Sequence, residues 1–69
     1  MFVRVMVTPT LSMALLAKSV LEAAGLRARD SGQFSDGWVD QPFYVEVPDD
    51  EIAEARDLLI ENGWERQLL

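Results

Sequence analysis

The hydrophobic positions at the start of the chain repeat every second residue, and then about every 3.6 residues. Residues 2–7 alternate, which is typical of a half-buried strand. The expected inner face holds Val3, Val5 and Val7, and the expected outer face holds Phe2, Arg4 and Met6. Thr10 is a suitable N-cap for a helix over residues 11–24, and Gly25 stands where a helix end favours left-handed backbone angles. The chain therefore begins with a predicted strand and a predicted helix.

The same two patterns return in the rest of the chain. Residues 26–30 alternate over a short length, and residues 42–47 alternate again, so both segments predict strands. The inner face of the second segment is expected to hold Phe43, Val45 and Val47. Pro48 ends this strand, because proline cannot donate to a ladder. Carboxylates at residues 49–51 favour a helix N-terminus, and a helical pattern follows over residues 52–62.

Gly63 ends the second predicted helix and leaves a short tail. We expect residues 64–69 either to form a short fourth strand or to lie along the sheet edge, with Trp64 covering the end of the core. The order of elements is then β-α-β-β-α, with or without a final strand. Two helices on one face of a small antiparallel sheet form the ferredoxin-like fold, an α+β sandwich. We expect residues 1–69 to form a single domain of this type.

The small size of the chain limits its stability. A domain of about 60 residues buries only about 60% of the surface that its unfolded chain exposes, so a monomer of 69 residues is expected to be marginally stable. The sequence has no cysteine, which excludes both a disulfide and a thiolate metal site. Self-association is the remaining source of burial, and we expect a homodimer or a larger homo-oligomer.

A helical projection of residues 11–24 separates an apolar sector from a polar one. The residues expected in the core are Met13, Ala14, Leu16, Ala17, Val20, Leu21, Ala23 and Ala24. Leu15 falls among the polar residues and Leu11 lies at their edge; they are either ordinary isolated surface leucines or part of a subunit interface. In the second helix, the residues expected inward are Ile52, Ala55, Leu59 and Ile60, and those expected in water are Glu54, Asp57 and Glu61.

The formal net charge of −6 is unevenly distributed along the chain. Residues 1–29 carry four basic residues against one acidic residue, whereas residues 30–69 carry two against eleven. Binding to a phosphate backbone needs clustered Lys and Arg, and a net-acidic chain with a single lysine offers little of that, so we expect no nucleic-acid partner. No apolar stretch approaches the roughly 20 residues of a membrane span, and we expect a cytoplasmic protein without membrane contact.

The residue types that usually carry catalysis are scarce. The chain has no histidine and no cysteine, its hydroxyl residues have no recognisable activating partner, and no glycine-rich phosphate motif is present. Asp30, Asp36 and Asp40 offer carboxylates for an acid–base pair or a hard cation, but their spacing matches no known ligand loop and favours solvated side chains. We therefore expect no enzyme, no catalytic residue, no metal and no cofactor.

Two stretches of the chain resemble a known family. They are "LEAAGL" at Leu21–Leu26 and "VEVPDDEIAEARDLL" at Val45–Leu59, and they look like the small bacterial family named for prokaryotic signal-transducing proteins. The similarity extends from Val3 to about Asn62. This family is a domain of unknown function, named for its fold similarity to the nitrogen-regulatory P-II proteins. The resemblance implies a P-II-like, ferredoxin-like fold and a regulatory role in signal transduction, with no catalytic residues to carry over.

The resemblance also implies a role for the segment between the second and third strands. In P-II-type proteins this connection reaches partner proteins, and small effectors bind near its base. Residues 31–42 take the equivalent place, and the residues expected to bind a protein partner or a small effector are Phe34, Asp36, Trp38 and Asp40. The segment is shorter than a P-II effector loop and lacks a basic cluster for nucleotide phosphates.

Other readings of this segment and of the protein remain open. Phe34 and Trp38 would instead cover a thin sheet, or Trp38 would begin the third strand early. For the protein as a whole, the second alternative is a structural adaptor that docks to one partner through its sheet edge or its exposed leucines. A small enzyme with an acidic site is the third alternative, disfavoured by the absence of histidine and cysteine.

Overall fold

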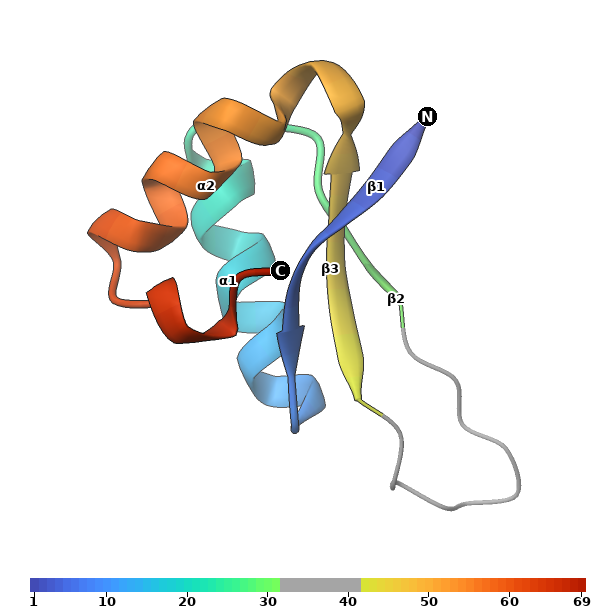
Figure 1. Ribbon diagram of the computed structural model, residues 1–69, viewed down its shortest axis with the longest axis vertical. Helices are drawn as coiled ribbons and strands as arrows, with labels where there is room; N and C mark the ends of the chain where they lie inside the picture. The colour runs from blue at the N-terminus through green and yellow to red at the C-terminus, as the bar shows by residue number, and fades with distance from the viewer. Residues whose placement is uncertain (32–41) are drawn as a thin grey trace.

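A computed structural model describes residues 1–31 and 42–69 (Figure 1). This part of the chain forms a three-stranded antiparallel sheet and two α-helices, which confirms the coarse α+β prediction. The elements in chain order are β1 (Phe2–Thr8), α1 (Leu11–Ala23), β2 (Arg29–Ser31), β3 (Phe43–Pro48), the 3₁₀ turn η1 (Asp49–Glu51), α2 (Ile52–Glu61) and the 3₁₀ turn η2 (Glu65–Gln67).

The sheet has the strand order β1-β3-β2, and β3 is antiparallel to both of its neighbours. Consequently β1 and β2 run parallel to each other with β3 between them, and α1 makes the connection across the sheet. Both helices lie on the same side of the sheet in Figure 1. The opposite face of the sheet carries no helix among the described residues, and this uncovered face positions the candidate site.

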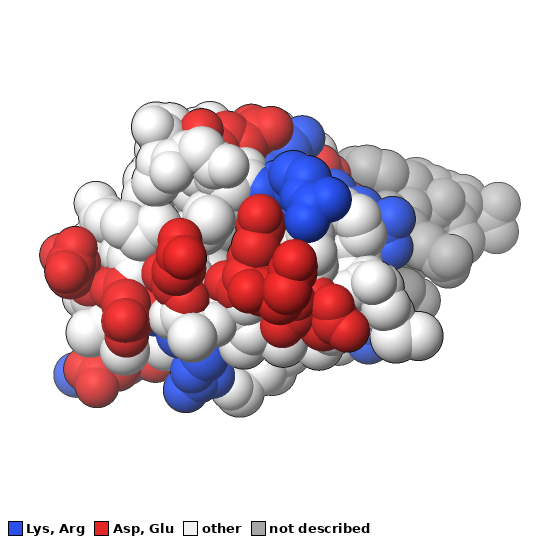
Figure 2. Space-filling model, turned by 90° about the horizontal axis from the view of Figure 1, so that it is seen from above, with Lys and Arg blue, Asp and Glu red and all other residues white. Residues whose placement is uncertain are grey.

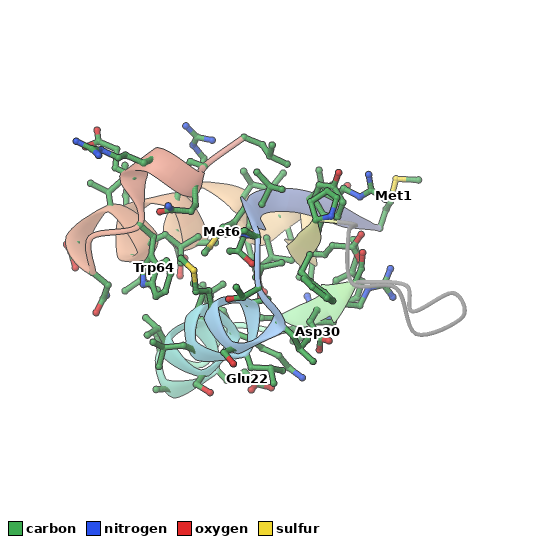
Figure 3. All side chains as sticks on the ribbon, turned by 90° about the horizontal axis from the view of Figure 1, so that it is seen from below. Met1, Met6, Glu22, Asp30 and Trp64 are labelled. Carbon is green, nitrogen blue, oxygen red and sulfur yellow. The ribbon has the colours of Figure 1, made fainter. Side chains whose placement is uncertain are left out.

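A β-bulge in β1 changes which of its residues face the core. The register with β3 shifts between Arg4 and Met6, so the alternation predicted for residues 2–7 is interrupted at Val5. Val5 and Met6 are therefore both buried, although Met6 was predicted on the outer face. Figure 3 shows the Met6 side chain in the interior. Beyond the bulge, Val7 pairs with Tyr44 and belongs to the uncovered face, so its predicted place on the inner face is wrong.

The predicted helix caps are confirmed at both ends of α1. Thr10 has extended backbone angles, and its side-chain oxygen accepts a hydrogen bond of 3.2 Å from the Met13 N–H. Gly25 has a φ of 88° and lies beside a hydrogen bond of 3.1 Å from the Leu26 N–H to the Leu21 carbonyl, the bond of a Schellman motif. The second helix ends in the same way at Gly63, whose φ is 87°.

The core lies between the sheet and the helices and is narrower than the predicted apolar sectors. Its buried members are Val5, Met6, Ala14, Ala17, Leu21, Leu26, Phe43, Val45, Val47, Ala55 and Leu59. Only three residues of α1 are buried, Ala14, Ala17 and Leu21, and their spacing puts them on one stripe of the helix. The predictions for Leu16 and Ile60 are wrong, since these residues are 57% and 43% exposed. Ala23 and Ala24 are also exposed, contrary to prediction.

The C-terminal residues run beside the outer edge of β1 without forming a regular strand. A single antiparallel bridge joins Leu68 to Met6, and the Leu69 N–H donates a 3.1 Å hydrogen bond to the Val5 carbonyl. Trp64 is half-buried against the core, as predicted. Within the described ranges, neither helix has the length and apolar character that crossing a membrane requires.

Candidate binding surface

The candidate surface is the uncovered face of the sheet. Its residues are the outward members of the three alternating strands, and the ones that interact are Phe2 and Arg4 of β1, Arg29 of β2, and Tyr44 and Glu46 of β3. Register brings them together, because Arg4 and Arg29 both lie opposite Glu46, one on each side of the central strand. We call these five residues the sheet-face cluster.

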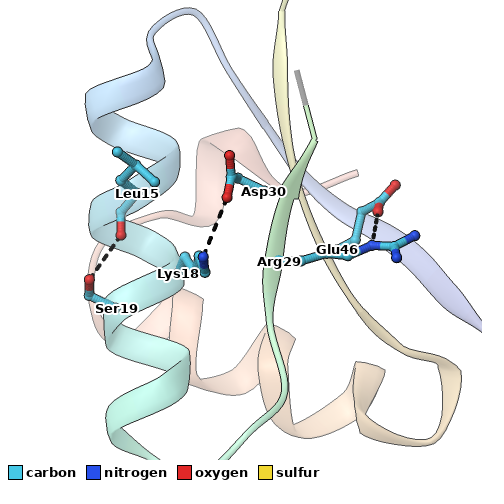
Figure 4. A network of polar contacts seen from close by, with 6 residues as sticks. All are labelled: Leu15, Lys18, Ser19, Arg29, Asp30 and Glu46. Atoms are coloured by element: carbon cyan, nitrogen blue, oxygen red, sulfur yellow. Dashed lines mark hydrogen bonds and ion pairs between the residues drawn. The ribbon is translucent and has the colours of Figure 1, made fainter. Parts of the chain in front are cut away.

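Glu46 is the centre of the sheet-face cluster and is only 9% exposed. The Arg29 Nε donates a hydrogen bond of 2.7 Å to one carboxylate oxygen of Glu46, and the Arg4 Nε lies 3.8 Å from the other oxygen. Figure 4 shows the Arg29–Glu46 pair on the side of the sheet away from α1. A charge-assisted hydrogen bond of this length compensates the partial burial of the carboxylate.

Both arginines also stack on aromatic rings of the same face. The Arg4 Cζ lies 4.0 Å from the centre of the Tyr44 ring, and the Arg29 Cζ lies 4.2 Å from the centre of the Phe2 ring. A guanidinium over an aromatic face is attracted by the negative face of the ring. Each arginine is thus held from two directions, by Glu46 and by a ring, and the side chains of the cluster are ordered before any ligand binds.

The sign of the charge differs between the two sides of the molecule. The sheet-face cluster has two guanidinium groups and one carboxylate, so it carries one positive charge in excess. Acidic residues gather on η1 and α2, and Figure 2 shows several of them as a band on the surface seen from above. The members of this acidic band are Asp49, Asp50, Glu51, Glu54, Asp57 and Glu61. Arg27 lies within 3.7 Å and 3.6 Å of Asp50 and Glu51 respectively, and so ties the segment before β2 to η1.

Asp30, one of the three carboxylates considered for acid–base or cation chemistry, has a structural partner. Its Oδ1 lies 3.4 Å from the Lys18 Nζ, so this ion pair joins β2 to α1 (Figure 4). Asp30 is therefore held on the helix side of the sheet, away from the sheet-face cluster. No group of three or more potential metal-ligating side chains occurs among the residues that the structure describes.

The residues predicted to bind a partner or effector, Phe34, Asp36, Trp38 and Asp40, lie outside the described residues. The structure does place the two ends of their segment, because Ser31 pairs with Tyr44 next to Phe43. The segment therefore begins and ends at one end of the sheet, next to the Arg4–Tyr44 contact.

The two leucines predicted at a subunit interface differ in exposure. Leu11 is half-buried and packs against the core, whereas Leu15 is 43% exposed on α1.

Sequence reasoning missed the sheet-face cluster, although it had placed Phe2 and Arg4 on the outer face. The available signal was the pair of opposite charges at outward positions of two predicted strands, Arg4 and Glu46.

Comparisons with known proteins add no family to these observations. No protein-family model matches the chain, and neither a curated protein nor a solved structure matches it. The resemblance to prokaryotic signal-transducing proteins therefore stays a prediction, and functional inference depends on the geometry described above.

Proposed function

We propose that the protein is a regulatory, signal-transducing binding module of bacterial type rather than an enzyme. In this proposal, residues 31–42 bind a protein partner or a small effector, with Phe34 as the contact and Trp38 as the anchor. The observation that supports it is the position of this segment, which leaves the sheet at Ser31 and returns at Phe43, beside the ordered Arg4–Tyr44 contact of the uncovered face. Aromatic residues are over-represented where proteins bind partners.

The proposal also covers the topology of the fold, the cellular compartment and the oligomeric state of the protein. We infer a ferredoxin-like topology, which is supported by the parallel β1 and β2 on either side of β3 and by the bridge that puts Leu68 beside β1. This topology and the resemblance over Leu21–Leu26 and Val45–Leu59 favour a P-II-like regulator. Such a regulator would act in the cytoplasm as a homo-oligomer.

Two variants test the binding role of the segment. We expect Phe34→Ala to leave the melting temperature nearly unchanged and to reduce capture of partners from a lysate of the source cell. We expect Trp38→Ala to lower both. Ile60→Ala is the matched control, because it removes a large apolar side chain that is 43% exposed and lies on α2. Thermal melting and a pull-down are measured side by side for each protein.

A ligand screen tests whether the partner is a small molecule. Nucleotides, amino acids and divalent metals are added one at a time, because a ligand that binds only the folded state must raise the melting temperature.

The proposal fails if Phe34→Ala lowers the free energy of unfolding by about 3 kcal/mol or more, as a core truncation does. Phe34 would then be part of the core rather than a contact.

A further inference from the structure

We propose that the uncovered sheet face binds an acidic segment of a partner protein, and that the guanidinium of Arg4, lying over Tyr44, receives a carboxylate of that segment. The proposal deepens the proposed function and rests on the protein being a binding module. It concerns the described strands, however, and is tested without any change in residues 31–42.

The two arginines of the sheet-face cluster have different roles. Arg29 makes the short hydrogen bond to Glu46, at 2.7 Å, and one arginine suffices to neutralise one carboxylate. The Arg4 Nε is 3.8 Å from Glu46, and the side chain of Arg4 makes no hydrogen bond with any described residue. The side chain of Arg4 is 55% exposed, so its donors face solvent. Arg4 therefore keeps all of its side-chain donors free of hydrogen bonds to described residues, whereas Arg29 commits its Nε to Glu46.

The guanidinium of Arg4 is already positioned for an anion. Stacking on Tyr44 fixes the plane of the group, and the ion pair with Glu46 limits its motion along the strand. The planar fork of an arginine matches the two oxygens of a carboxylate. Because less side-chain freedom is lost on binding, a positioned arginine contributes more to affinity than a free one does.

An extended segment fits this face better than a free carboxylate ion does. The face is a flat sheet surface, and a single solvent-exposed ion pair strengthens binding by only about fivefold or less. Phe2, Val7 and Tyr44 are half-buried on the same face and offer apolar surface on either side of Arg4. A peptide can cover that surface while its carboxylate pairs with Arg4, so the two contributions add.

Two other occupants of this face, a second copy of the chain and a nucleic acid, fit it less well than an acidic segment does. Two copies of this chain that met through the same face would bring together two faces with excess positive charge. A contact between this face and the acidic band of another copy would be head-to-tail and would not close into a dimer. For nucleic acid, one face of each ring, Phe2 and Tyr44, is covered by a guanidinium group, which blocks base stacking there, and the sheet-face cluster lacks the clustered Lys and Arg that binding a phosphate backbone needs.

The acidic band does not prevent an acidic segment from approaching. The members of the acidic band on α2 lie on the side of the sheet opposite to Arg4, since both helices cover the other face. The members on η1 have cationic partners, because Asp49 lies 3.9 Å from the Met1 amine, and Asp50 and Glu51 pair with Arg27. At physiological ionic strength, exposed charges that are more than about 8 Å apart are largely screened. Next to Arg4, the charged members of the sheet-face cluster are Arg29 and Glu46, so the cluster presents one positive charge in excess.

A hexaglutamate peptide is the probe for this proposal. It is titrated into the ¹⁵N-labelled protein at 20 mM and 150 mM salt, and binding is followed by the shifts of backbone amides and of the arginine Nε–H signals. We expect shifts at Arg4 and along β1 and β3, with weaker binding at the higher salt. Arg4→Ala should weaken binding about fivefold, and Arg4→Lys should weaken it less, because it keeps the charge but loses the fork.

Arg66→Ala is the matched control. It changes the net charge by the same amount, and Arg66 is exposed on η2 with no side-chain partner among the described residues. We expect its affinity for hexaglutamate to stay within twofold of the wild type. Melting curves show that each variant is folded before it is titrated, and Arg4→Lys carries the test if Arg4→Ala unfolds.

Several outcomes would overturn the proposal. Two concern the peptide itself: hexaglutamate does not bind the wild type, or Arg4→Ala and Arg66→Ala weaken its binding equally. Two concern other ligands: free glutarate competes at the same concentration as the peptide, or an oligoadenylate RNA binds more tightly than the peptide. The last is that the signals of β1 and β3 shift with protein concentration alone, as self-association would cause. Each of these leaves the test on Phe34 unaffected, so this proposal and the proposed function fail separately.

Discussion

Gly25 ends α1 because its backbone adopts an angle that other residues reach only with strain. Its φ is 88°, and a β-carbon built at this position would meet no atom within 4 Å. Space is therefore available for a side chain, and the cost of substitution comes from the backbone alone. That cost is about 1–2 kcal/mol for an ordinary L-residue in the left-handed region, and it is larger for a β-branched residue and smaller for asparagine.

We predict that Gly25→Val lowers the melting temperature clearly and that Gly25→Asn lowers it less. For a domain of this size, a loss of about 1 kcal/mol lowers the melting temperature by about 4–8 °C. Thermal unfolding followed by circular dichroism measures both variants. The comparison of the two melting temperatures is the control. A steric clash would lower both of them, whereas backbone strain lowers that of Gly25→Asn less. An unchanged melting curve for Gly25→Val would mean that α1 ends by another conformation.

At the scale of the elements, strands and helices with clear periodicity were predicted from sequence. Features that depend on tertiary contacts, such as the bulge and the width of the buried helix stripe, were not predicted. The alternation of residues 2–7 correctly predicted a strand at β1. The bulge at Val5 could not be predicted in this way, because it depends on pairing with β3, which lies far along the chain. Leu16 and Ile60 looked like core residues because a projection shows an apolar sector but not how wide a stripe the sheet can cover. The second strand was predicted at residues 26–30 and is observed at Arg29–Ser31.

The candidate surface was hidden from sequence reasoning for the same reason. Arg4 and Glu46 are ordinary outward residues when each strand is considered alone. Only the register of β1, β3 and β2 brings two arginines to one carboxylate and places a ring under each guanidinium. The residues that were predicted to bind, such as Phe34 and Trp38, were chosen for their unusual composition in a connecting segment, and they lie outside the described residues.

We predict that the C-terminal residues stabilise the outer edge of β1 through their backbone. Leu69→Pro removes the N–H that bonds to the Val5 carbonyl, and Leu68 already has the extended angles that a residue before proline requires, with φ −68° and ψ 144°. The expected loss is about 1 kcal/mol in urea unfolding. Leu69→Ala is the control, because it shortens the side chain but keeps the N–H. Identical curves for the two variants would show that this hydrogen bond adds nothing.

For the molecule as a whole, we predict self-association at micromolar concentration. The core of so short a chain is small, and Leu15 and Leu16 remain 43% and 57% exposed on the helical side. Light scattering should give at least twice the monomer mass, and replacing both leucines by glutamate should reduce it to the monomer mass. Leu11 is not a useful target, because it packs against the core. A wild-type protein that is folded and monomeric would contradict the prediction.

The central place of β3 decides when this chain is able to fold during its synthesis. The ribosome makes β1, α1 and β2 first, yet β1 and β2 are joined only through β3. Until residues 43–48 have emerged, neither of these strands has the neighbour with which it pairs among the described residues. Pairing of β1 with β3 then closes a long stretch of chain, which makes it a slower step than the formation of a local hairpin. Of the strands that the structure describes, a nascent chain that stops before Phe43 contains β1 and β2 but lacks β3, with which both of them pair.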